Sequence, residues 1–285
     1  DRKPWRFAKL STRNEHWEQM TDLLLCKPTH FNIDYEINPW MDIGNDIDHD
    51  LALSQWEKMV ECLSKAGARL KFIDPERGYP DMVFTANAGL VYRDTVILSN
   101  FKHQERRHEK WFFKDWFLKN GYRVIELPDH ISFEGEGDAL FFEDTLFMGY
   151  GFRTDPESHA IISKALNIDV VSCELVDPRF YHLDTCFLPL KNRIVYYRQA
   201  FSKFSQEIML EKLVEIGHEI RVLDVLNIHE EQAQDFLCNS IEINETVVAP
   251  SDMFSLSFAG KKTSICNMSE FMKSGGAVKC LTLKL

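Results

Sequence analysis

The residue with the most reactive side chain near the end of the chain is Cys280. It follows the pair Gly275-Gly276, and Lys279 precedes it directly. A thiol becomes a strong nucleophile when a nearby cation or histidine favours its ionised form. The alternative is a buried cysteine that only packs. The pattern therefore makes Cys280 a candidate nucleophile that requires a partner.

A histidine and a carboxylate stand two residues apart in the segment YHLDTCF. His182 and Asp184 alternate with apolar residues, so we expect both side chains on one face of a strand. A carboxylate at that distance would raise the pKa of the histidine and keep it protonated. The alternative is a half-buried histidine with a structural role. We predict His182 as the partner of Cys280.

Two further segments concentrate polar side chains. In PDMVFTANAG, Asp81 and Asn87 stand at the two ends of a strand-like run. In FEGEGDAL, Glu134, Glu136 and Asp138 alternate with glycines, which allow a backbone to approach a ligand closely. Turn capping explains the first segment equally well. An acidic turn or a calcium loop is the alternative for the second, although EF-hand spacing is absent.

These segments must be positioned by a repeated supersecondary unit. Helical spacing followed by a strand recurs along the chain, and a glycine separates the two in three units, at Gly67, Gly121 and Gly217. Such a glycine suits the position after a helix, where φ is positive. The strands that end each unit are expected to begin near Ala68, Tyr122, Ile168, Glu219 and Lys261.

Five similar units at a spacing of roughly 40–55 residues favour an array around an axis. We therefore predict an α/β fold with pseudo-fivefold repeats, a five-bladed α/β-propeller. A doubly wound open sheet is the alternative. No linker composition divides the chain, so we expect a single catalytic domain over residues 22–285 after an N-terminal extension over residues 1–21.

Composition limits the classes of function. The 285 residues carry a formal net charge of −11 and no basic stripe, which disfavours a nucleic-acid partner. The seven cysteines are irregularly spaced without a CxxC pair, which indicates reduced thiols, no metal site and a cytoplasmic location. No apolar run is long enough to span a membrane. Whether the chain forms a homo-oligomer is left open.

Taken together, the segments resemble the arginine deiminase, dimethylarginine dimethylaminohydrolase and amidinotransferase superfamily. The resemblance covers residues 22–285 and is most marked to arginine dihydrolases of the cyanobacterial type. The matching segments are YEINPWM, PDMVFTANAGLV, FEGEGDAL, GYGFRT, FYHLDTCF and GGAVKCLTL. The superfamily has the five-bladed α/β-propeller called pentein, which agrees with the repeat count.

The resemblance also implies roles for individual residues. Cys280 matches the nucleophile, His182 the general acid and base, and Glu134 the carboxylate that holds the substrate guanidinium, with Asp184 as its second partner. The implied residues of the substrate pocket are Asn38, Asp81, Phe84, Asn87, Arg106, Asp138 and Arg153. Arg106 and Arg153 match the arginines that bind the substrate α-carboxylate, and Arg107 is an alternative to Arg106.

Asn87 departs from the deiminase pattern, which has an aspartate at this position. An asparagine offers a donor and an acceptor, so it can bind a neutral ureido group as well as a cationic guanidinium. The dihydrolase-type proteins share the asparagine. The resemblance therefore implies an arginine dihydrolase that needs no cofactor and releases ornithine, carbon dioxide and ammonia.

Three alternatives remain. A deiminase or a dimethylarginine hydrolase would stop at citrulline. An amidinotransferase would need an amine acceptor and release no net ammonia. A catalytically silent pentein would act as a binding protein without thiol-dependent turnover.

Overall fold

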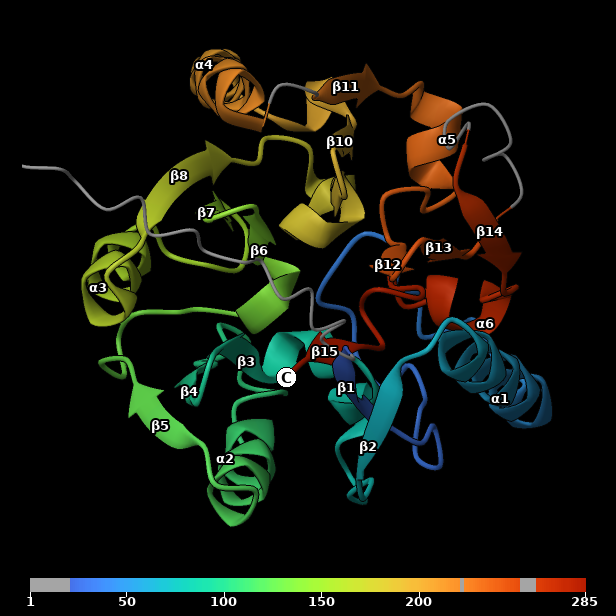
Figure 1. Cartoon of the computed structure of the whole chain (residues 1–285). Helices are drawn as coiled ribbons and strands as arrows, with labels where there is room; N and C mark the ends of the chain where they lie inside the picture. The colour runs from blue at the N-terminus through green and yellow to red at the C-terminus, as the bar shows by residue number, and fades with distance from the viewer. Residues whose placement is uncertain (1–20, 221–222, 252–259) are drawn as a thin grey trace, which may run out of the picture.

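Five small sheets lie around a common centre in the computed structural model (Figure 1), which describes residues 21–220, 223–251 and 260–285. The predicted N-terminal extension lies outside the described residues except for its last residue. Each sheet has three strands. The sheets are β15-β1-β2 (Leu283–Lys284, Asp22–Cys26, Arg69–Ile73), β3-β4-β5 (Gly89–Tyr92, Thr95–Leu98, Arg123–Glu126), β6-β7-β8 (Ala139–Phe142, Thr145–Tyr150, Asp169–Glu174), β9-β10-β11 (Phe187–Leu190, Arg193–Tyr196, Asp224–Asn227) and β12-β13-β14 (Ile241–Ile243, Thr246–Ala249, Lys262–Ile265).

All five sheets share one pairing pattern. The middle strand pairs antiparallel with one neighbour and parallel with the other. A parallel pair needs a long crossover connection. Helices supply it in four units: α1 (His49–Lys65), α2 (Glu109–Lys119), α3 (Glu157–Leu166) and α4 (Lys203–Ile220). Because β15 pairs with β1, the end of the chain completes the first sheet.

The predicted α/β fold with five repeats is confirmed. Four of the five outer strands begin within one residue of the predicted positions, and Gly67 and Gly121 have φ values of 98° and 85°. The fourth unit differs, because α4 continues through Gly217 and β11 begins only at Asp224. The buried face of α4, which includes Ile216, continues past the expected end. Tertiary packing of that face outweighs the cost of a glycine, about 1 kcal/mol.

Short 3₁₀ turns precede the inner strands. η1 (Pro80–Val83) and η2 (Thr85–Ala88) lead into β3, η3 (Gly135–Gly137) into β6, and η5 (Leu183–Thr185) into β9. The strands predicted for residues 81–87 and 182–184 are therefore wrong. The remaining short elements are η4 (Pro178–Phe180), η6 (Arg198–Ala200), α5 (Glu230–Gln234) and α6 (Ser269–Met272).

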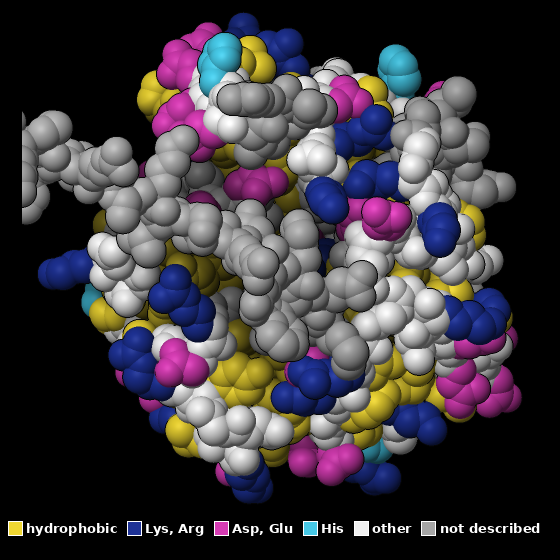
Figure 2. All heavy atoms as spheres, viewed as in Figure 1, with side chains coloured by type: hydrophobic (Ala, Val, Ile, Leu, Met, Phe, Trp, Pro, Cys, Tyr) yellow, Lys and Arg dark blue, Asp and Glu magenta, His cyan; other side chains and the backbone are white. Residues whose placement is uncertain are grey.

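The visible face carries basic and acidic side chains side by side, and its described part shows no broad basic area (Figure 2). Within the described residues, no helix is long and apolar enough to cross a membrane. The cytoplasmic location stays a prediction.

Candidate active site

The polar segments noted in the sequence occupy equivalent places in the repeats. Each lies directly before the inner strand of a sheet: Asn87 before β3, Asp138 before β6 and Asp184 before β9. Asn239 precedes β12 and Cys280 precedes β15 in the same way. The inner strands surround the centre, and η3 contacts both η2 and η5. The fivefold repeat thus brings side chains from distant parts of the chain together.

Cys280 is 2% exposed and has two polar neighbours. Its Sγ lies 3.2 Å from Asp184 Oδ2, and Asn239 Nδ2 donates to Sγ over 3.0 Å. Burial is the main cause that raises the pKa of the thiol, and the Asp184 carboxylate raises it further. Asn239 and Lys279 lower the pKa, but burial and Asp184 outweigh them. The thiol is therefore neutral in the free protein, unlike the thiolate expected from the neighbouring lysine.

The two glycines before Cys280 allow close packing around it. At Gly275, where φ is 82°, a Cβ atom would lie 2.9 Å from Tyr181 Oη. At Gly276 it would lie 2.7 Å from the Phe84 ring and 3.0 Å from Cys280 Cβ. Tyr181 Oη also donates to the Gly275 carbonyl over 2.9 Å. A side chain at Gly276 would therefore push Phe84 and Cys280 apart, and one at Gly275 would displace Tyr181.

His182 pairs with Glu134 rather than with the thiol. His182 Nε2 lies 2.8 Å from Glu134 Oε2, and no hydrogen bond joins His182 to Cys280 within the described residues. Burial alone would raise the pKa of Glu134, but Arg153, His182 and Arg106 overcome burial and hold it well below its usual range. Since Glu134 is ionised, His182 Nε2 donates and Glu134 Oε2 accepts in this contact.

The three carboxylates of FEGEGDAL point in different directions. Glu134 is occupied by His182, by Arg153 Nη1 at 2.9 Å and by the Lys102 amide at 3.2 Å. Asp138 accepts from the Leu183 amide, and burial raises its pKa to about 6. Glu136 instead pairs with Lys279 Nζ at 2.9 Å.

Two other carboxylates present oxygen atoms without partners. Asp184 Oδ1, Asp81 Oδ1 and Ser274 Oγ are buried and make no hydrogen bond to any residue that the structure describes. Burial raises the pKa of Asp184 to about 7 and also raises the pKa of Asp81. A buried acceptor without a donor is costly, and such atoms are uncommon in folded proteins. This end of the site is therefore suited to a ligand rich in N–H groups.

Arg106 and Asn87 form a fixed pair. Arg106 Nη1 donates to Asn87 Oδ1 over 2.8 Å, Nη2 donates to the Asp81 carbonyl over 3.1 Å, and two further bonds of 2.8 and 2.9 Å engage Glu109. Asn87 Nδ2 donates to the Glu134 carbonyl over 3.4 Å. Arg107 instead reaches the carbonyls of residues 101 and 102. The structure thus places Arg106, not Arg107, beside the other predicted site residues.

Arg153 and Asn38 connect the centre to the loop before α1. The Arg153 guanidinium donates to the Ile37 carbonyl over 2.8 Å and lies over the Tyr181 ring at 4.8 Å. Asn38 Nδ2 donates to the Ser274 carbonyl over 3.1 Å, close to the Gly275 turn.

A cavity of about 260 Å³ brings most of the predicted residues together. It is lined by Ile37, Asn38, Asp81, Phe84, Asn87, Arg106, Arg153, Tyr181, Ser274 and Cys280. His182, Glu134, Asp138 and Asp184 do not line it; they lie directly behind, in contact with Arg153 or Cys280 or with one another. Asn239 was not predicted from the sequence, because no motif surrounds it. It occupies the place in the fifth repeat that Asn87 occupies in the second.

The side chain of Asn239 is fully buried and makes four hydrogen bonds, two of them to Cys280. Its Oδ1 accepts from the amides of Ala277 at 2.8 Å and Cys280 at 3.1 Å, and its Nδ2 donates to the sulfur and to the Asp184 carbonyl. The side chain therefore fixes both the loop and the thiol.

We expect Asn239→Asp to slow alkylation of Cys280 by iodoacetamide at least about tenfold at neutral pH. Aspartate keeps the acceptor but replaces the donor to sulfur with a charge that raises the thiol pKa, and one pKa unit corresponds to tenfold. The measurement is the pH dependence of the alkylation rate. Ser240→Ala is the matched control, since Ser240 Oγ donates only to the Leu237 carbonyl. Equal rates in the two variants would contradict the role of Asn239.

A fivefold α/β repeat with a cysteine, a histidine and several carboxylates at its centre defines the class of pentein proteins that modify guanidino groups. The chain belongs to the family described as N,N dimethylarginine dimethylhydrolase, eukaryotic, whose sequence model matches residues 27–285.

The alignments with characterised relatives cover most of this chain. It is 42% identical over 272 residues to the bifunctional arginine dihydrolase/ornithine cyclodeaminase ArgZ of Synechocystis, covering 92% of this chain but 37% of that protein. It is 37% identical over 266 residues to N(G),N(G)-dimethylarginine dimethylaminohydrolase of Mycobacterium tuberculosis, covering 92% of this chain and 84% of that one. A solved N-terminal domain of ArgZ, covalently bound to a reaction intermediate, is 40% identical with a TM-score of 0.84, covering 93% of this chain and 97% of that one.

Proposed function

We propose that the chain is an arginine dihydrolase that uses Cys280 as its nucleophile. The observation that carries the proposal is the group of unpaired acceptors beside the thiol: Asp184 Oδ1, Asp81 Oδ1 and Ser274 Oγ. A guanidinium is a flat cation with several N–H donors, so it can satisfy acceptors that no described residue engages. The similarity to ArgZ supports the same assignment.

Substrate arrival would itself activate the thiol. Without a ligand, the charge of Asp184 opposes ionisation of Cys280. A guanidinium beside Asp184 offsets that charge, so the proton leaves sulfur more readily when the cation is present. The thiolate then forms as its electrophile is delivered.

The first half of the proposed reaction forms a covalent adduct. The Cys280 thiol passes its proton to His182 as sulfur bonds to the guanidinium carbon, and His182 then donates this proton to the departing ammonia as the C–N bond breaks. Glu134 is a positioning residue in this scheme, because its oxygens hold His182 and Arg153. Direct contact of Glu134 with the substrate, implied by the resemblance, is not needed for this role, since Glu134 does not line the cavity.

The second half releases the adduct with water. Neutral His182 takes a proton from water, the oxygen bonds to the carbon, and the C–S bond breaks to give citrulline. A second round on the ureido carbon gives ornithine, ammonia and carbon dioxide. Asn87 supports this round, because its amide can donate to or accept from a neutral ureido group.

Product analysis separates this proposal from hydrolysis of methylated arginine, which the family match favours. With arginine labelled in the guanidino carbon, we expect labelled carbon dioxide and ornithine, with two ammonia molecules per arginine. Accumulation of labelled citrulline as the final product would contradict the dihydrolase. Turnover of dimethylarginine to citrulline and dimethylamine, without turnover of arginine, would establish the alternative.

A further inference from the structure

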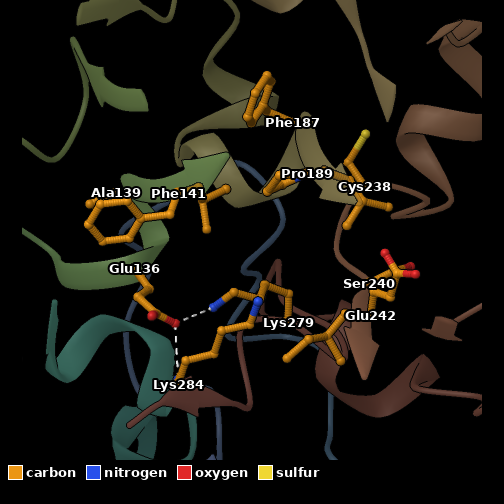
Figure 3. A pocket seen from close by; sticks show the side chains of 13 residues that line it. Glu136, Ala139, Phe141, Phe187, Pro189, Cys238, Ser240, Glu242, Lys279 and Lys284 are labelled. Carbon is orange, nitrogen blue, oxygen red and sulfur yellow. Dashed lines mark hydrogen bonds and ion pairs between the residues drawn. The ribbon is translucent and has the colours of Figure 1, made fainter. Parts of the chain in front are cut away.

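A second cavity of about 460 Å³ lies at the centre and shares no lining residue with the thiol cavity. Figure 3 shows its two unlike sides. Phe141, Phe187 and Pro189 form an apolar side, and Lys279, Lys284 and Glu136 lie opposite.

A buried ion pair lines the second cavity. Lys279 Nζ lies 2.9 Å from Glu136 Oε2 and donates to the Thr282 carbonyl over 3.2 Å. Lys279 is the neighbour of Cys280 in the chain, but its side chain lines the second cavity while Cys280 lines the first.

The charges around the second cavity leave one cation unmatched. Lys279 is paired with Glu136, and Glu242 is paired with Lys261 at 2.6 Å. The backbone amide of Lys284 donates to Glu136 over 3.2 Å, whereas its side chain is exposed and its ammonium has no partner among the described residues. Lys279 also retains one N–H, since two of its three donors are used.

We propose that this cavity is a binding site for a small carboxylate with an apolar body. The Lys284 ammonium and the remaining Lys279 N–H would receive the carboxylate, and Phe141, Phe187 and Pro189 would cover the apolar part. Charge complementarity favours an anion over a cation, and the apolar side disfavours an inorganic anion, which would lose hydration without new partners.

The test uses 4-methylbenzoate as the probe and calorimetry as the readout, with the full chain. We expect saturable binding that Lys284→Met weakens at least about tenfold, because a charge-assisted hydrogen bond is lost. Lys284→Arg should retain binding, and the uncharged analogue 4-methylbenzamide should bind at least about tenfold more weakly. Lys164→Met is the matched control, since Lys164 is an exposed lysine on α3.

Binding to the active-site arginines is excluded by repeating the titration after Cys280 has been alkylated with iodoacetamide. The proposal requires that binding persists there, whether or not the protein turns over arginine. No saturable binding by the unmodified protein would overturn it. Equal affinity in the Lys284→Met variant, an equal loss in the Lys164→Met variant, or loss of binding on alkylation would also overturn it.

Discussion

Cys280→Ala is expected to lower kcat for arginine by at least about 10⁴-fold, because no other group can form the covalent adduct. The measurement is ammonia release under saturating substrate. Cys280 is 2% exposed in the free protein, and truncation to alanine removes a single sulfur atom, so the fold should persist. Arginine binding should also persist, since the carboxylates that would receive the guanidinium remain.

Cys26→Ala is the matched control for this prediction. Cys26 is also a fully buried thiol, and burial raises its pKa to about 12, but it lies in β1 outside the cavity. We expect its kcat to stay within about twofold of the parent, with a small loss of stability from the cavity. Comparable activity in the two variants would exclude Cys280 as the nucleophile, whereas no turnover by the parent protein would favour a silent pentein.

His182→Gln is expected to lower kcat by about 10²–10⁴-fold, the usual contribution of a general acid and base. Glutamine can still donate to Glu134 but cannot exchange a proton with the leaving group or with water. Because His182 bonds Glu134 and does not itself line the cavity, KM should change much less than kcat. Steady-state kinetics with arginine measure both quantities.

His159→Gln controls for removal of a buried imidazole. His159 is 4% exposed and hydrogen-bonds Ser172 Oγ at 2.7 Å, away from the thiol. Burial lowers its pKa to about 4, so it is neutral at the assay pH. If both variants lost activity to the same extent, the role of His182 would be structural.

Much of the architecture could be predicted because it repeats. The recurrence of helix and strand predicted the first residue of four outer strands to within one residue. It also indicated the fold, although the strand pairing could not be read from the sequence. The prediction for the fourth unit was wrong at Gly217, where the helix was expected to end. A glycine inside a helix and a glycine that ends a helix look the same in the local sequence. Only the burial of residues such as Ile216 separates the two cases.

Which residues form the site could be predicted from the sequence, but which of them contact one another could not. Reactive side chains in unusual sequence contexts, such as His182 and Cys280, were evident without coordinates. Which partners they take depends on distances between repeats. The thiol contacts Asp184 and Asn239, and the histidine contacts Glu134. Asn239 was missed because an isolated asparagine before a strand has no local signal.

The internal partners of the two arginines bear on which end of an amino acid the protein can distinguish. Arg106 uses four of its five N–H groups on Glu109, Asn87 and the Asp81 carbonyl, whereas Arg153 uses two, on Glu134 and the Ile37 carbonyl. A substrate carboxylate would therefore face Arg106, in which only one N–H group is unused among the described residues, and Arg153, in which three are unused. Selectivity for arginine over its decarboxylated analogue agmatine would then fall mainly on Arg153, while Arg106 would act as a rigid brace for Asn87.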